Sequence, residues 1–178
     1  MMMRIAAVLI VASSLGTLGC ERKGGGAAKD KLAEVKAAGV VRVGVKADAP
    51  PFGWKDEYGY NGFDVDIASA VAEQLGIPKV EFVTVTSADR LEKVAAGEVD
   101  FAIASMTITR SREATVDFSV PYFQDGQGLL VRADSPIASY EDLGGKSVAA
   151  ARGATSIQTI TQVQPECTVK EFDGYQKA

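Results

Sequence analysis

Short apolar runs rich in β-branched residues predict three buried strands before residue 105. They cover residues 40–45, 80–85 and 99–104, and their lengths suit strands that are covered on both faces. Segments with helical periodicity separate the runs. Strands that alternate with helices favour a parallel α/β arrangement.

Two segments between these runs predict helices. In the first, Ile67, Val71 and Leu75 recur at helical spacing, with acidic residues in the first turn. In the second, residues 91–96 carry a shorter helical pattern. A glycine follows each pattern, as it does at many helix ends.

Loop and capping signals fall between these elements. Pro50 and Pro51 end the first strand and predict a loop. Phe52 and Trp54 belong to this loop, where they are placed to face a ligand. Thr109 is placed to cap a short helix that follows it.

A strand-helix-strand series is predicted toward the C-terminus. Residues 128–132 are expected to return as a strand that closes the first unit, and a polar connector follows. After it, residues 146–151 predict a strand, residues 153–163 a helix and residues 168–172 another strand. With the connector, this second unit has only about 45 residues, fewer than a domain needs to form its own core. We therefore expect this second unit to be incomplete.

The composition excludes several kinds of catalytic and binding site. The chain has 178 residues with 19 basic and 23 acidic side chains, and its formal net charge is −4. No basic run is long enough to follow a phosphate backbone, so no nucleic acid partner is expected. The sequence contains no histidine, which removes imidazole zinc sites, Ser/His/Asp triads and Cys/His dyads. We expect no metal and no cofactor.

The N-terminus has the layout of a secretory signal. Arg4 precedes an apolar run over residues 5–12, and small residues lead to Cys20. The end of this segment resembles a bacterial lipoprotein signal, which predicts a signal peptide over residues 1–19 and a lipid on Cys20. The alternative is cleavage by the ordinary signal peptidase, with Cys20 incidental. With a lipid on Cys20, residues 20–39 would tether a periplasmic or cell-surface protein to the membrane.

Four segments together resemble the polar amino acid family of periplasmic substrate-binding proteins, the extracellular receptors of ABC importers. They are residues 43–52, 62–67, 105–112 and 117–123, in the family's order and at its spacing. The resemblance implies an α/β fold of the type II periplasmic binding protein kind, in which two lobes close on a ligand like a clamshell. It implies a binding protein and not an enzyme, with an ABC transporter permease as its membrane partner.

The resemblance also divides the chain. Residues 40–133 would form lobe 1, and residues 134–178 would begin lobe 2, whose remainder is expected beyond Ala178. The family's acceptor for the α-ammonium of the ligand lies on a later strand of lobe 2. We therefore expect this chain alone to bind its ligand weakly or not at all. The protein is also expected to be a monomer.

A free amino acid needs a cationic fork and N–H donors for its α-carboxylate. The resemblance assigns the fork to Arg112, further contacts to Ser105 and Thr107, and an apolar wall to Phe63. On lobe 2 it assigns a second carboxylate clamp to Thr155 and Ser156. The residues themselves leave alternatives open: Arg112 as a solvated surface arginine, Thr155 as an ordinary N-cap and Phe63 as a core aromatic.

Side-chain selectivity is expected from another group of positions. The resemblance to glutamate and aspartate binders rests on a base at Lys46, a serine at Ser87, an arginine at Arg90 and a tyrosine at Tyr175. A second carboxylate in a closing cleft needs cationic partners of its own, since an unpaired buried charge is costly. Glutamate or aspartate is therefore the expected ligand. The alternative is that Lys46 and Arg90 are solvated.

Two other functions share this fold. Dehydratases and the regulatory part of some peptidoglycan lyases resemble these binding proteins, and so do sensor domains that feed a kinase or channel. An enzyme would need a general acid or base in the cleft. Without histidine the candidates are Asp48 and Glu57, neither of which lies at a recognisable catalytic spacing.

Overall fold

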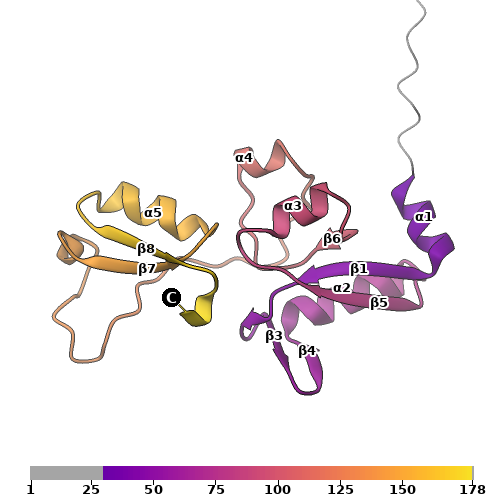
Figure 1. Ribbon diagram of the computed structural model, residues 1–178, viewed down its shortest axis with the longest axis horizontal. Coiled ribbons are helices and arrows are strands. Elements are labelled where there is room, and N and C mark those ends of the chain that lie inside the picture. Colours follow the sequence, from indigo (N-terminus) through magenta and orange to yellow (C-terminus); the bar gives the residue numbers. More distant parts are fainter. Residues whose placement is uncertain (1–29, 178) are drawn as a thin grey trace, which may run out of the picture.

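The computed structural model describes residues 30–177 (Figure 1). It contains two groups of elements joined by a long extended segment, one group on the right of Figure 1 and the other on the left. The predicted signal peptide, Cys20 and the start of the predicted tether lie outside the described residues. Within them, no helix is both long and apolar enough to cross a bilayer.

A parallel three-stranded sheet forms the centre of the first group. Its order is β5 (Lys79–Thr84), β1 (Val40–Val45) and β6 (Phe101–Ala102). Val41, Val43 and Val45 of β1 are at most 2% exposed, which confirms the buried β-branched run as the core strand. The prediction for residues 99–104 was too long, because β6 pairs with β1 over only two residues before the chain turns away.

Helices α2 (Phe63–Gln74) and α3 (Arg90–Ala95) confirm the two predicted helices within about a turn. Helix α1 (Lys31–Ala38) was not predicted and lies inside the segment expected to be a tether. The side chain of Asp30 caps α1 by accepting a hydrogen bond from the Ala33 N–H at 3.1 Å. Val35, which is 7% exposed, anchors α1 to the core, and a single buried residue gives little periodic signal.

A small antiparallel sheet replaces the loop predicted after β1. It consists of β2 (Asp48–Ala49), β3 (Gly53–Asp56) and β4 (Gly59–Asn61). Phe52 lies in the loop as predicted, but Trp54 lies in β3 and pairs with Asn61 of β4. The sequence pattern hid this hairpin because each strand is very short.

The segment between the two groups is mostly irregular. Thr109 caps the short helix α4 (Arg110–Glu113) by accepting a hydrogen bond from the Arg112 N–H at 3.4 Å, as predicted. The strand predicted at residues 128–132 is absent, and Leu130 in this stretch is 98% exposed. No strand of the described residues pairs with it to supply the ladder hydrogen bonds that a strand needs.

The second group confirms the predicted strand-helix-strand series. Strands β7 (Ser147–Ala151) and β8 (Thr168–Phe172) run parallel, and helix α5 (Thr155–Val163) lies along this pair in Figure 1. Short 3-10 helices precede and follow them, η1 (Glu141–Leu143) and η2 (Tyr175–Lys177). The helix cap is Ala154, without a side-chain hydrogen bond, so the N-cap role considered for Thr155 is wrong. The η2 turn contacts β2 and thereby reaches the first group.

Candidate functional site

Arg112 lies where the two groups of elements meet. One guanidinium nitrogen donates to the Thr107 carbonyl at 2.6 Å, and another donates to the Gly153 carbonyl of the second group at 2.9 Å. Partial burial lowers the pKa of Arg112. Its partners are thus neutral carbonyls, and no carboxylate of the described residues lies within ion-pair distance. Arg112 is half-buried and keeps part of the surface position considered from the sequence, but its guanidinium bridges two loops.

A second guanidinium is buried close by. Arg90, at the start of α3, is 2% exposed and donates from one nitrogen to the carbonyls of Ala104 and Ser105. Its Nε is the only buried side-chain nitrogen or oxygen of the described residues without a hydrogen-bond partner. Burial first, and then the positive charge of Arg112, lower the pKa of Arg90 to about 10. The junction therefore holds two mutually repelling cations, which favours the binding of an anion.

Lys46 forms a polar cluster at the same junction. Its side chain is fully buried, and its Nζ lies 2.9 Å from Asp48 Oδ1 and 3.4 Å from Ser87 Oγ. The Nζ also lies 4.7 Å from the centre of the Tyr175 ring. The other oxygen of Asp48 accepts the Tyr175 backbone N–H at 2.8 Å. Lys46 and Arg90 are thus not solvated, and Lys46 has a counter-charge within the chain.

Aromatic rings form one wall of the junction. Phe63 packs against Phe52, Tyr122 and Phe123, with ring centres 6.2, 6.2 and 5.9 Å away. Its side chain is nevertheless 41% exposed. The core aromatic considered from the sequence is therefore wrong, and Phe63 keeps a surface against which a ligand can lie.

Hydroxyl groups face each other across the junction. Thr107 Oγ1 and Thr155 Oγ1 lie 3.3 Å apart, and the Gln127 amide donates to Thr155 Oγ1 at 3.0 Å. Ser156 follows on the first turn of α5 and is half-buried. The structure thus brings together predicted residues from both groups, with Thr107 and Thr155 separated by 48 positions in the sequence.

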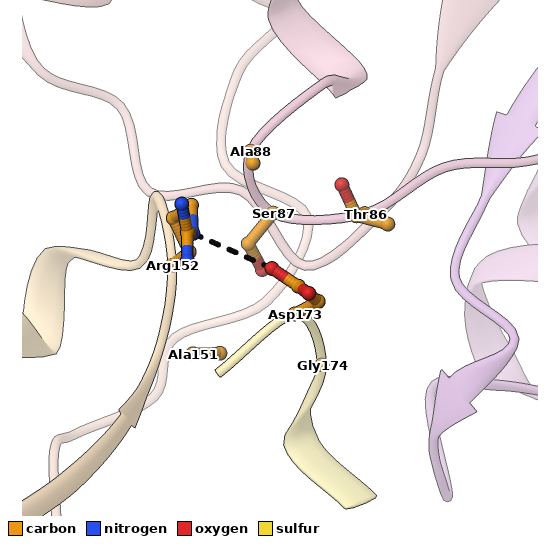
Figure 2. Close-up of a pocket in the computed structure, with 7 residues that line it drawn as sticks. All are labelled: Thr86, Ser87, Ala88, Ala151, Arg152, Asp173 and Gly174. Carbon is orange, nitrogen blue, oxygen red and sulfur yellow. Dashed lines mark ion pairs between the residues drawn. The ribbon is translucent and has the colours of Figure 1, made fainter. Parts of the chain in front are cut away.

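Two cavities open between the groups. The first has about 200 Å³ and is bordered by the loop after β5 and the ends of β7 and β8, as Figure 2 shows: Thr86, Ser87, Ala88, Ala151, Arg152, Asp173 and Gly174. There Arg152 Nε and Asp173 Oδ1 form an ion pair at 3.4 Å. The second, of about 210 Å³, lies beside Arg112, Gly153 and Thr155. The other predicted site residues line neither of these two cavities.

The sequence did not point to two acidic residues of the junction. Asp48 was considered only as an enzyme's acid or base, and its pairing with Lys46 was not anticipated. Asp64 was noted as an acid in the first turn of a helix, yet its side chain is completely buried. Its position between Phe63 and Val65, two apolar residues, was the available signal. Among residues 30–177, no group of three or more His, Cys, Asp or Glu side chains is arranged to hold a metal.

Comparison with known proteins places these features in a family context. Residues 41–173 match the profile of the bacterial extracellular solute-binding proteins, family 3. The chain is 42% identical to the ABC transporter glutamine-binding protein GlnH of Bacillus subtilis (strain 168), over 155 residues that cover 84% of this chain and 57% of that protein. It is 44% identical to the glutamine-binding protein of Geobacillus stearothermophilus, over 157 residues that cover 85% of this chain and 60% of the relative. The chain thus spans less than two thirds of either relative.

A crystal structure gives the same result for the fold. The ancestral amino acid-binding protein AncCDT-1, described as a precursor of cyclohexadienyl dehydratase, is 40% identical and superposes with a TM-score of 0.78. The superposition covers 83% of this chain and 66% of AncCDT-1.

Proposed function

Because the chain belongs to the bacterial extracellular solute-binding proteins, family 3, we propose that it is the amino-acid-binding receptor of an ABC importer. It has the type II periplasmic binding protein fold, and the proposed ligand site lies between its two lobes. The two glutamine-binding relatives support a free amino acid as the ligand. The receptor would act outside the cytoplasm and deliver its ligand to a membrane permease.

This proposal rests mainly on Arg112 and Arg90, two guanidinium groups that form no ion pair with a carboxylate of residues 30–177. A ligand α-carboxylate at Arg112 would replace the Gly153 carbonyl as acceptor and relieve the repulsion between Arg112 and Arg90. The exposed face of Phe63 would lie against the carbon skeleton. Thr107 and Thr155 would complete the polar contacts from the two lobes.

The side chain of the ligand would lie toward Lys46, and glutamine is the first candidate. Asp48 already neutralises Lys46 at 2.9 Å, so this lysine does not require a second carboxylate. An amide needs one donor and one acceptor, and the Lys46 ammonium and the Asp48 carboxylate offer one of each. The names of the two bacterial relatives point the same way.

Glutamate or aspartate, the ligand expected from the sequence, is the second candidate. Arg90 supports it, because this buried guanidinium has no carboxylate partner among the described residues and one nitrogen without any hydrogen bond. With Arg90 and Arg112 together, the junction could hold two carboxylates. The choice between the two candidates depends on which cation the ligand side chain meets.

Calorimetry on the complete gene product tests the proposal. We expect glutamine to bind most tightly, then glutamate, with arginine much weaker. Arg112→Ala should weaken binding of every amino acid by about 100-fold, because charge-assisted hydrogen bonds to the α-carboxylate are lost. Arg110→Ala is the matched control, since Arg110 lies exposed on the same short helix. Failure to bind any amino acid, or equal affinities of the two variants, would reject the proposal.

Membrane attachment through Cys20 belongs to the same proposal. The names of the two relatives give no information on lipid attachment, and Cys20 lies outside the described residues. Mass spectrometry of the mature N-terminus separates the alternatives, because a diacylglycerol adduct on Cys20 would establish the anchor. Ordinary signal cleavage would leave an unmodified thiol.

An enzyme on the same fold receives some support from AncCDT-1, a precursor of a dehydratase. The acids of this chain argue against it. Asp48 is engaged by Lys46 and by the Tyr175 N–H, and Glu57 is exposed in the turn between β3 and β4. Neither is a free acid or base inside the junction, so binding remains the proposed function.

A further inference from the structure

We propose that Asp64 is a positioning residue for amino-acid binding, one that holds the backbone of Ser105 and through it the guanidinium of Arg90. This inference rests on the proposed function. Asp64 itself lines neither of the two cavities. Its effect on the ligand would therefore pass through the loop between β6 and α4.

Asp64 is a fully buried carboxylate with three donors aimed at it. Its Oδ2 accepts the Ser105 N–H at 3.0 Å and the Ser105 hydroxyl at 3.1 Å, while its Oδ1 accepts the Tyr122 hydroxyl at 3.0 Å. No lysine or arginine of the described residues forms an ion pair with it. A buried carboxylate that has hydrogen bonds but no ion pair fixes the geometry of its donors, because each lost donor leaves the charge less solvated.

Ser105 has the conformation that such a constraint can impose. With a φ of 49°, it is the only non-glycine residue of the described chain in the left-handed region. Most side chains avoid this region because of steric repulsion. Two hydrogen bonds from one residue to one carboxylate oxygen hold Ser105 there.

The conformation of Ser105 has a consequence for Arg90. The carbonyls of Ala104 and Ser105 both accept hydrogen bonds from the same Arg90 nitrogen. Asp64 also favours the charged form of Arg90, since its negative charge acts to raise the pKa of that guanidinium against the opposing effects of burial and Arg112. Asp64 thus both orients Arg90 through a backbone turn and supplies part of its counter-charge.

Three of the four family-like segments meet at this carboxylate. Asp64 lies in residues 62–67, Ser105 in residues 105–112 and Tyr122 in residues 117–123. Tyr122 is also a ring neighbour of Phe63. The Asp64 carboxylate therefore connects the aromatic rings around Phe63, the loop that contains Ser105 and the segment that contains Tyr122.

Substitution by the isosteric amide tests this role. Asp64→Asn keeps the volume but removes the charge and one acceptor position, so the affinity for glutamine and for glutamate should fall together, by about 10-fold or more. The matched control is Val65→Ala, a buried change in the same turn of α2. The two variants are compared at equal loss of thermal stability. If Asp64 were merely structural, the folded Asp64→Asn variant would bind with the same affinity as the folded Val65→Ala variant. That result would overturn the proposal.

A second substitution reports on the backbone. Glycine occupies the left-handed region without strain, so Asp64→Asn combined with Ser105→Gly should recover part of the affinity lost by Asp64→Asn alone. Should Asp64→Asn fail to fold, Ser105→Ala with Tyr122→Phe leaves the carboxylate only one of its three donors and should lower the affinity several-fold. Unchanged affinity in that double variant contradicts the proposal. Absence of amino-acid binding in the unaltered protein would instead contradict the proposed function.

Discussion

The ammonium of Lys46 is completely buried at the lobe junction, and three features of its surroundings make this possible. Asp48 supplies a counter-charge at 2.9 Å, Ser87 a hydroxyl at 3.4 Å and Tyr175 the face of an aromatic ring at 4.7 Å. Desolvating an ammonium costs several kcal/mol unless such partners replace water. Removal of one partner of the ion pair should therefore lower the free energy of unfolding much more than removal of both partners.

Lys46→Met should lower the free energy of unfolding by about 3 kcal/mol, because it leaves the Asp48 carboxylate without its cation. The double variant Lys46→Met, Asp48→Asn should recover most of this loss. Urea denaturation of the complete gene product measures both. Lys55→Met is the control, since Lys55 also lies over a tyrosine ring, at 4.8 Å, but is exposed; a change of about 0.5 kcal/mol is expected there. Equal effects at Lys46 and Lys55 would contradict this account.

Which residues meet at the junction could be predicted only in part. The resemblance to a family selected Lys46, Arg90 and Arg112, and the structure brings all three to the junction. It did not indicate Asp48 or Asp64 as partners, because Asp64 meets Ser105 across 41 positions and Asp48 meets Tyr175 across 127. Pairings of this range depend on the path of the chain in space, which periodicity does not contain.

Asp100 joins three elements of lobe 1. Its carboxylate accepts the backbone N–H of Arg42 in β1 at 2.8 Å and a guanidinium nitrogen of the same residue at 2.9 Å. It also pairs with Lys31 of α1 at 3.0 Å. Burial alone would raise the pKa of Asp100, but the hydrogen bonds from Arg42 and Lys31 outweigh it and hold the pKa below its ordinary value.

The lowered pKa fixes how this contact depends on pH. The unfolded carboxyl binds its proton more readily than the folded one, so the stabilisation is present above the unfolded pKa and is lost as the pH falls through the folded pKa. Asp100→Asn should therefore lower the free energy of unfolding by about 2 kcal/mol at pH 7 and by much less in strong acid. Chemical denaturation at both pH values checks this, with exposed Asp117→Asn as the control. A difference that stays the same at both pH values would contradict it.

Regular elements were predicted best where their signal is local. The run at β1 and the pattern of α2 were recognisable, because β1 is a continuous run of mostly buried β-branched residues and α2 buries residues at helical spacing. Helix α1 escaped prediction with its single buried residue, Val35. Residues 128–132 have the composition of a strand, but a strand also needs a partner, and none of the described strands pairs with them.

On the scale of the whole molecule, the two lobes are in close contact at Gly153. Gly153 has a φ of 75°, and a Cβ added to it would lie 2.5 Å from the Ser87 carbonyl oxygen and 2.7 Å from the Ala88 Cα. The Gly153 carbonyl is the acceptor for Arg112. The close arrangement of the lobes, which no local pattern indicates, thus depends in part on the absence of a side chain at Gly153.

Gly153→Ala should keep the lobes apart even when a ligand is present. Two effects act on this substitution, the strain of a left-handed alanine, about 1 kcal/mol, and the clash with the backbone at Ser87. Gly145→Ala separates them, because Gly145 has a similar φ of 69° but no atom within 4 Å of an added Cβ. We expect both variants of the complete gene product to lose similar stability. Only Gly153→Ala should also lose ligand affinity, by about 10-fold or more, and show no ligand-induced decrease of the radius of gyration in small-angle X-ray scattering. If Gly153→Ala compacts with ligand as Gly145→Ala does, the lobes close by a route that does not bring Gly153 against Ser87.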